Sequence, residues 1–263
     1  MRVPGADAAR SVAWPGMSNL PRIAAPVAAA CVASVLALTG GRAMASPSTI
    51  PQDTTVPTSS VPPAPDTSAP RRDAWRDVKV VYRVETDDPV VFITIDDGAW
   101  TSDALGDWLD RHDLPITNFV MPGILEERAD WFLSRPSMSF QNHSYSHAHM
   151  TMSTLRRQTF EICRASRIVG EVTGVRPTMF RPPRGSWNDD TRRAAHACGI
   201  RHIVMWNVTA DRSTIRTATG KAVRAGDIVI LHWRPELQDS LEHLLAHLRR
   251  LGLRPALLDD YLS

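Results

Sequence analysis

Two histidines, His143 and His147, lie four residues apart in the segment His-Ser-Tyr-Ser-His. If this segment forms a helical turn, that spacing places both imidazoles on one side of it. With a carboxylate from elsewhere in the chain, they would form a metal site of two histidines and one carboxylate, with positions open to water and substrate. The alternative is a capped turn with two ordinary polar histidines, and the nearby His149 could be mistaken for a ligand.

Two adjacent carboxylates, Asp96 and Asp97, follow an apolar segment and precede Gly98. Successive side chains of a strand point to opposite faces, so the two aspartates need not share a role. One could bind a cation while the other acts as a base toward a bound water. The alternative is an ordinary Asp-Asp-Gly turn that ends a strand, and Gly98 suits either interpretation because it permits a positive φ or a close backbone approach.

Arg181 and His232 also stand at the ends of predicted strands. Two prolines follow Arg181 and restrict the backbone, so its guanidinium could hold a carboxylate by a forked contact. The alternative is a surface ion pair, which contributes little stability. His232 ends the apolar run 228–231, which predicts either a position at the mouth of a site or a core histidine bonded to the backbone.

Strand-like and helix-like patterns alternate along the C-terminal 190 residues or so. Strands are expected at 90–95, 116–120, 138–142, 178–181, 202–208 and 227–231, and helices at 101–112, 151–172, 188–198 and 236–250. This α/β alternation predicts a parallel sheet with helices outside, either an open doubly wound sheet or a closed barrel. In both folds the carboxyl ends of the strands converge on one face, where the ionisable residues described above would meet.

The N-terminal 75 residues differ in composition from the rest of the chain. Arg22 precedes the apolar stretch 23–38, and Ala43-Met44-Ala45 has the small-x-small pattern of a cleavage site, so residues 1–45 are expected to be a signal peptide. An N-terminal membrane anchor is the alternative, although the stretch is short for a core of about 30 Å. Residues 46–75 hold seven prolines and ten Ser or Thr, which predicts a disordered linker. Residues 76–263 remain as one domain.

Charge and cysteine content exclude several classes of protein. Residues 1–45 carry four arginines and one aspartate, so the remainder has 26 basic and 27 acidic residues and shows no case for a nucleic-acid binder. Three cysteines are too few for a disulfide-built miniprotein or a cysteine-rich zinc module. Cys163 and Cys198 fall on adjacent predicted helices, and in an oxidising compartment they could form a disulfide if the geometry allows it.

Four segments together resemble the polysaccharide deacetylase domain, carbohydrate esterase family 4. They are Thr94-Ile-Asp-Asp-Gly98, His143-Ser-Tyr-Ser-His147, Arg181-Pro-Pro183 and Ile230-Leu-His232, and they occur in the order of the family within residues 88–260. The resemblance implies a distorted (β/α) barrel of about seven parallel strands. It also implies hydrolytic removal of N-acetyl groups from amino-sugar polymers of the peptidoglycan or chitin type, with a divalent metal, usually zinc.

The same resemblance implies a role for each of these residues. Asp97, His143 and His147 would bind the metal. Asp96 would be the general base for a metal-activated water, and Arg181 would orient Asp96. Zinc suits this chemistry because it lowers the pKa of its water to about 7.

The last two roles concern the departing amine and the oxyanion. His232 would be the general acid that protonates the amine, and a backbone N–H near Arg184 would help to hold the oxyanion. The segment 206–211 matches the fourth motif of the family only loosely, so Asp211 is the candidate for polarising His232. Ala99-Trp100 stands where the family usually has a proline after Asp-Asp-Gly, and Trp100 could form a platform on which a sugar stacks. Trp187, Trp206 and Trp233 could stack on sugars or fill the core.

The leading hypothesis is a secreted or wall-associated, metal-dependent N-deacetylase. Its partner would be an N-acetylated polysaccharide, with no nucleic acid, no stable membrane insertion after cleavage, and a monomeric state. The altered fourth motif motivates one alternative, a non-catalytic wall-polysaccharide-binding module on the same fold. Another alternative is an O-acetyl esterase acting on a xylan-like polymer with the same residues.

Overall fold

The computed structural model describes residues 73–262, so the predicted signal peptide 1–45 and residues 46–72 of the predicted linker lie outside the described residues. The first element is a short 3₁₀ helix, Ala74–Asp77, which buries Trp75. The guanidinium of Arg193 lies 4.5 Å from the centre of the Trp75 ring. The folded unit therefore includes two residues that precede the predicted domain start at residue 76.

The centre of the fold is one sheet whose path runs β1-β6-β5-β4-β3-β2-β9-β7-β8, with β10 paired to β2. The strands are β1 Lys79–Val81, β2 Val90–Asp97, β3 Ile116–Val120, β4 Met138–Asn142, β5 Met179–Phe180, β6 His202–Val204, β7 Val208–Ala210, β8 Ile215–Thr217, β9 Ile228–His232 and β10 Arg254–Ala256. Only the β7–β8 pairing is antiparallel among the described strands. The seven strands from β6 to β7 are all parallel, as predicted, and they form an incomplete barrel whose two ends do not pair within residues 73–262.

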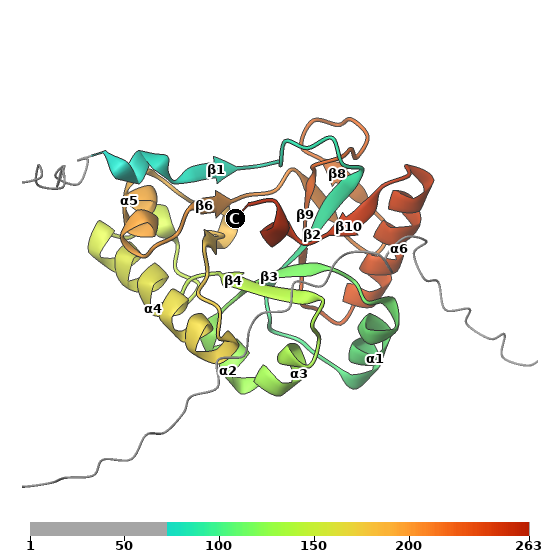
Figure 1. The fold of residues 1–263 in the computed structure, drawn as a ribbon, viewed down its shortest axis with the longest axis horizontal. Helices are drawn as coiled ribbons and strands as arrows, with labels where there is room; N and C mark the ends of the chain where they lie inside the picture. Colours follow the sequence, from blue (N-terminus) through green and yellow to red (C-terminus); the bar gives the residue numbers. More distant parts are fainter. Residues whose placement is uncertain (1–72, 263) are drawn as a thin grey trace, which may run out of the picture. The chain divides into compact units, whose positions relative to one another are not determined.

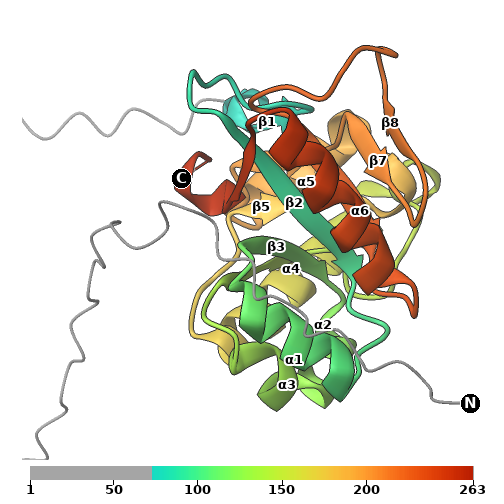
Figure 2. The ribbon, with the colours of Figure 1, turned by 90° about the vertical axis from the view of Figure 1, so that its right-hand side faces the viewer.

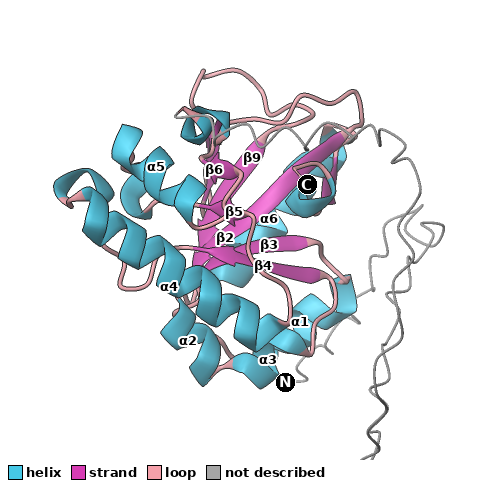
Figure 3. Ribbon diagram, turned by 60° about the vertical axis from the view of Figure 1, so that its left-hand side comes forward, coloured by secondary structure: helices cyan, strands magenta, loops and turns pink. Residues whose placement is uncertain are grey.

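Helices cover the outer side of this curved sheet (Figure 1, Figure 2, Figure 3). They are α1 Asp103–His112, α2 Pro122–Glu127, α3 Ala129–Leu133, α4 Leu155–Thr173, α5 Asp189–Ala197 and α6 Leu237–Arg250. Side-chain caps start three of them, because Ser102, Thr154 and Asn188 each accept a hydrogen bond from a backbone N–H of the first turn. α4 ends at Gly174, which takes the left-handed conformation typical of a helix C-terminus.

The structure departs from the sequence predictions at a few elements. The expected strand 202–208 is divided into β6 and β7, because β6 pairs with β1 and β5 whereas β7 pairs with β9 and β8. Asn207 lies between them, and its side-chain amide donates to Asp227 while its side-chain carbonyl accepts the N–H of Ile228. The short elements α2, α3, β1, β8 and β10 were not anticipated, since runs of three to six residues carry too little periodicity.

Strand β2 lies at the centre of the core. The side chains of β2 from residue 90 to 96 are buried, as expected for a parallel strand with elements on both faces. A second cluster joins α4 and α5 to β5 and β6 through residues such as Ile162, Phe180, Ala194 and Ile203. This core holds the strand ends in fixed relation to one another.

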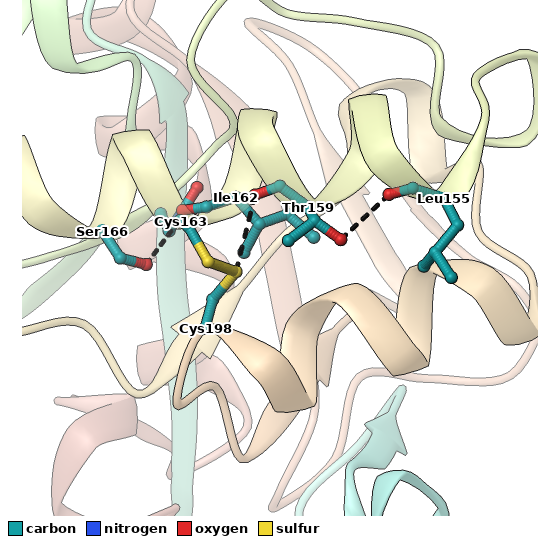
Figure 4. Close-up of a disulfide and its surroundings, with 7 residues drawn as sticks. Leu155, Thr159, Ile162, Cys163, Ser166 and Cys198 are labelled. Carbon is teal, nitrogen blue, oxygen red and sulfur yellow. Dashed lines mark hydrogen bonds between the residues drawn. A yellow bond between two sulfur atoms is a disulfide. The ribbon is translucent and has the colours of Figure 1, made fainter.

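Cys163 of α4 and Cys198 at the end of α5 form a disulfide, so the pairing that the sequence left open is present (Figure 4). Their Cα atoms are 4.8 Å apart, and 35 residues separate them in the sequence. Closing a loop of this size is expected to stabilise the fold by about 3–4 kcal/mol. The disulfide fixes α4 against α5.

The C-terminal segment is bonded to the interior of the sheet through Asp259. Its carboxylate accepts hydrogen bonds from Thr117 of β3 and from Ser139 and Gln141 of β4. Gln141 in turn accepts the backbone N–H of Met179. One carboxylate therefore bonds two neighbouring strands directly and a third, β5, through Gln141.

The substitution Asp259→Ala is expected to lower the free energy of unfolding by about 2–4 kcal/mol, because it leaves three polar side chains without their acceptor. Urea denaturation followed by circular dichroism measures this change. The neighbouring exposed Asp260 provides the control, and Asp260→Ala should change the free energy by no more than about 0.5 kcal/mol. Equal effects of the two substitutions would contradict the prediction.

Candidate active site

The ionisable residues predicted from the strand ends do meet at one edge of the sheet. β2 ends in Asp96 and Asp97, and Asp96 pairs in register with His232, the last residue of the neighbouring β9. His143 directly follows β4, and its N–H donates to the carbonyl of Val120 at the end of β3. Parallel pairing aligns these carboxyl ends, so side chains distant in sequence become neighbours.

Asp97 faces the two histidines through one oxygen. Its Oδ1 lies 3.4 Å from Nε2 of His143 and 3.5 Å from Nε2 of His147. The three ligand atoms lie within 4.8 Å of one another. The Oδ1 atom is buried and has no hydrogen-bond partner among the described residues. This buried carboxylate oxygen receives no hydrogen bond from the described residues and lies next to two imidazole nitrogens. These three atoms are the ligand types of a divalent metal site.

The orientation of His143 supports the same conclusion. Its Nδ1 lies 2.9 Å from the backbone carbonyl oxygen of Arg181, an acceptor that places the ring proton on Nδ1. The lone pair of Nε2 then points toward Asp97. A histidine that donates its other ring N–H to a carbonyl is the usual arrangement around bound metals.

The protonation states that burial and neighbouring charges favour are those of metal ligands. Burial on its own raises the pKa of Asp97, but the surrounding histidines, His143 first, lower it by more whenever they carry a proton toward it, so the pKa lies below its ordinary value. Burial lowers the pKa of His147, and His143 lowers it further. An ionised carboxylate and a neutral imidazole are the forms that bind a metal.

The His-Ser-Tyr-Ser-His segment is not the helical turn that its spacing suggested. It is an irregular loop in which Ser144 and His147 have φ of 68° and 57°. The side chain of Asn142 accepts the N–H of Ser144 at 2.7 Å and so starts the turn. The two imidazoles meet because of these left-handed residues, with ring centres 5.2 Å apart.

Backbone strain is concentrated around this group. Within residues 73–262, five residues other than glycine have a positive φ, and four of them are Asp97, Ser144, His147 and Arg184. Such conformations cost about 1–3 kcal/mol each and persist only where the surroundings enforce them. Their occurrence in three separate loops of the same edge of the sheet marks a functional site rather than a packing accident.

Asp96 is bonded to Arg181, the partner that the resemblance implied, but through one guanidinium nitrogen and not through the forked contact that the sequence suggested. Nη1 of Arg181 donates to Oδ1 of Asp96 at 2.8 Å and to the hydroxyl of Thr94 at 2.7 Å. Nε and Nη2 donate to the carbonyls of Val204 and Met205, both at 3.2 Å. The guanidinium is fully buried, so these bonds fix both its position and that of the carboxylate.

His232 lies beside Asp96 on the neighbouring strand and is partly buried. Burial lowers its pKa below the ordinary value, while the carboxylates of Asp96 and Asp97 act in the opposite direction. Its surroundings therefore act on the proton affinity of this imidazole in opposite directions, and burial has the larger effect.

Asp211 and His232 both line one small pocket. The carboxylate is 55% exposed and accepts the backbone N–H groups of Ser213 and Thr214 at 3.0 and 2.7 Å. Its nearest basic group is Arg216, at 3.9 Å. These contacts hold Asp211 within its own turn, so its predicted action on His232 stays a prediction.

The structure shows the surroundings of the tryptophans and of His149, for which the sequence left two roles open. Trp233 is buried and its indole N–H donates to Asn118, so it fills the core. Trp187 and Trp206 are partly buried and pack against the cluster between α4 and α5, and Trp100 is partly exposed. His149 lies outside the group of three ligands, with its Nδ1 3.1 Å from the hydroxyl of Ser186.

Sequence reasoning assigned no role to Thr94, Asn142 or Glu161, which all contact the site residues or their loops. Asn142 could have been noticed as a polar residue that ends a buried strand. Glu161 could have been noticed as an acid on the apolar face of a predicted helix. Neither signal indicates which atom the side chain contacts, because that depends on segments distant in sequence.

Replacing Arg181 by alanine is expected to lower the free energy of unfolding by about 3–5 kcal/mol, because Asp96 would remain buried without its partner. Thermal or urea unfolding of the purified variant measures the loss. The exposed Arg167, paired with Glu171, serves as the control, and Arg167→Ala should cost less than about 1 kcal/mol. A parent-like stability of Arg181→Ala would refute the importance of the buried pair.

Solved structures share this architecture. A peptidoglycan N-acetylglucosamine deacetylase named Bc1960 aligns with a TM-score of 0.61 and 18% identity, over 72% of this chain and 95% of its own. A mutant of BA3943, a CE4 family pseudoenzyme with restored enzymatic activity, aligns with a TM-score of 0.60 and 21% identity, over 71% of this chain and 72% of its own. The latter protein is from Bacillus anthracis. At this level of identity the similarity shows the fold.

Relatives are also found by sequence. A protein of Streptomyces coelicolor, described as uncharacterized, is 35% identical over 191 residues, which cover 70% of this chain and 77% of the relative. A peptidoglycan-N-acetylglucosamine deacetylase of Listeria monocytogenes is 27% identical over 65% of this chain and 38% of its own length. A bifunctional xylanase/xylan deacetylase of Cellvibrio japonicus is 29% identical over 64% of this chain and 27% of its own length. This chain thus matches only part of the latter two.

The family model described as polysaccharide deacetylase matches residues 83–203, a span that contains the Asp-Asp-Gly, His-Ser-Tyr-Ser-His and Arg-Pro-Pro segments. Solved structures of carbohydrate esterase family 4 share the fold of this chain. The family model and the relative from Streptomyces coelicolor show that the chain belongs to the polysaccharide deacetylase family.

Proposed function

We propose that this protein is an exported, metal-dependent hydrolase that removes N-acetyl groups from an amino-sugar polymer such as peptidoglycan. The observation that carries the proposal is the donor set of Asp97, His143 and His147, with a second carboxylate, Asp96, directly beside it. Two adjacent aspartates in different surroundings can take the separate roles of ligand and base.

The three side chains fit a divalent metal, and one oxygen and two imidazole nitrogens are a donor set that zinc accepts. The Oδ1 of Asp97, which receives no hydrogen bond within residues 73–262, and the Nε2 of His143, which faces it, argue for a cation at this point. When bound, such a metal polarises the acetyl carbonyl and makes a water acidic near neutral pH. Asp97 would remain ionised as a ligand.

Asp96 is the base in this proposal. Arg181 occupies its Oδ1, while its Oδ2 lies 3.9 Å from Nε2 of His143 and so faces the same group. The oxygen that does not bond to Arg181 can accept the proton of the attacking water. The buried guanidinium keeps the carboxylate in one orientation, which is the requirement for general base catalysis.

His232 is the acid. An amine leaves the tetrahedral carbon only when it is protonated, and His232 lies on the strand next to Asp96, at the same level of the sheet. Because burial lowers its pKa, the imidazolium gives up its proton more readily than a free histidine would. The nearby carboxylates counteract this effect, and so favour the charged form before the reaction.

The disulfide supports export, and one relative supports a polymer substrate. We propose that residues 1–45 are a signal peptide, that residues 46–75 are a spacer whose last two residues pack on the domain, and that residues 76–263 are the catalytic domain, acting as a monomer. A disulfide persists in oxidising compartments, which agrees with export. Within residues 73–262, no helix is long and apolar enough to cross a bilayer. The Listeria relative is named for peptidoglycan, which favours a wall polymer as the substrate.

Two alternatives have specific support. A non-catalytic binding module is suggested by the altered fourth motif, in which Asn207 serves a structural role, and by the pseudoenzyme among the similar structures. An O-acetyl esterase on a xylan-like polymer is suggested by the xylan deacetylase relative. All three functions would use the same edge of the sheet.

The purified chain is expected to release acetate from N-acetylated chito-oligomers or peptidoglycan, and a chelator should abolish the release. Asp96→Asn should lower kcat about 10²–10⁴-fold, the range expected for loss of a general base, with metal binding retained. Asp107→Asn, on the exposed face of α1, should leave the rate unchanged. Acetate can be measured enzymatically.

The outcomes separate the hypotheses. Release only from O-acetylated xylan would favour the esterase. Binding of polymer without release of acetate from any substrate, by a metal-loaded protein, would favour the binding module. Full activity after chelation would refute the metal centre.

A further inference from the structure

Glu161 of α4 is a buried carboxylate with no place in the proposed reaction. Its side chain is fully buried, and both oxygens are used. Oε2 accepts the backbone N–H of Ser146 at 2.8 Å, and Oε1 accepts the hydroxyl of the same serine at 2.7 Å. Arg157 lies 2.6 Å from Oε1 and also donates to the serine hydroxyl. A charge is tolerated in such a place only when it is fully bonded.

The serine that Glu161 binds is the residue before His147. The loop reaches His147 with left-handed residues at both positions 144 and 147. Such a path is unfavourable for residues other than glycine, so the loop needs contacts from outside to keep it. Glu161 takes both hydrogen-bond donors of Ser146 and thereby fixes the backbone directly beside the second histidine.

The other end of the loop is held by the same helix. Nδ2 of Asn142 donates to the carbonyl of Ile162 and to the hydroxyl of Ser166, both at 2.8 Å. Figure 4 shows Ile162 and Ser166 next to Cys163, whose disulfide ties the helix to α5. α4 therefore bonds to the histidine loop at Asn142, where the loop begins, and at Ser146, the residue before His147. The disulfide fixes α4 covalently to the end of α5.

We propose that Glu161 is a positioning residue that holds the histidine loop in the shape needed to bind the metal, an inference that rests on the metal centre of the proposed function. Glu161 acts through Ser146 and touches none of the three ligands. Without it, the loop must be ordered when the metal binds, and the free energy spent on ordering lowers the affinity. The two Nε2 atoms would no longer be held at 3.4 and 3.5 Å from Asp97.

The test is the affinity of the full chain for zinc, measured by competition with a chromophoric chelator. In Glu161→Gln, an NH2 group replaces one of the two accepting oxygens and faces the N–H or the hydroxyl of Ser146. We expect zinc to bind about 10–100-fold more weakly, the range found when groups that orient metal ligands are removed. The matched control is Glu171→Gln, an exposed glutamate of the same helix paired with Arg167, which should bind zinc like the parent protein.

A second variant covers the case in which Glu161→Gln does not fold. Ser146→Ala removes the hydroxyl but keeps the backbone N–H, and should weaken zinc binding about 2–10-fold, the equivalent of one hydrogen bond. Thermal unfolding of the metal-free proteins separates positioning from stability, because a merely structural role would lower the melting temperature and leave the zinc affinity unchanged.

The results distinguish this inference from the proposed function. If the parent binds zinc and the folded variants bind it equally well, the positioning role is refuted and the metal centre stands. If the parent itself binds no zinc, the metal centre falls, and the role of Glu161 falls with it.

Discussion

The structure of this site depends on one unsatisfied interaction, the buried oxygen of Asp97 that faces two imidazole nitrogens and no hydrogen-bond donor among the described residues. A fold does not ordinarily leave such an oxygen without a partner. His143 uses its other ring nitrogen on a backbone carbonyl. In the proposed function a cation would supply the missing partner, and the surrounding contacts would hold the three ligands in place for it.

The two aspartates of one dipeptide show how the fold gives adjacent, identical side chains different tasks. Asp96 continues the strand and is buried against Arg181, whereas Asp97 has a φ of 77° and turns toward the histidines. Gly98 follows with a φ of 87°. The change from extended to left-handed backbone at the end of β2 therefore separates a carboxylate held by a guanidinium from one available to a metal.

Much of the fold could be predicted because long elements carry strong periodic signals. The strands at 116–120 and 138–142 were predicted with the bounds that the structure shows, and α4, α5 and α6 were each predicted within a few residues. The expected single strand at 202–208 was wrong, since its two parts, β6 and β7, pair with different strands of the sheet. The helical turn expected for the histidine pair was also wrong, because the left-handed residues that shape it are supported by a helix that follows in sequence.

What the sequence determined by itself was the identity and order of the chemical groups, together with the parallel topology that brings strand ends to one edge. Four short segments, each ambiguous alone, pointed to the same site because the carboxyl ends of parallel strands must converge. Only the tertiary structure decided which atoms face each other: that Arg181 bonds Asp96, that Oδ1 of Asp97 stays without a donor, and that Glu161 supports the loop of His147. These contacts join residues 15 to 85 positions apart, and their geometry depends on the packing of whole elements, which no local pattern encodes.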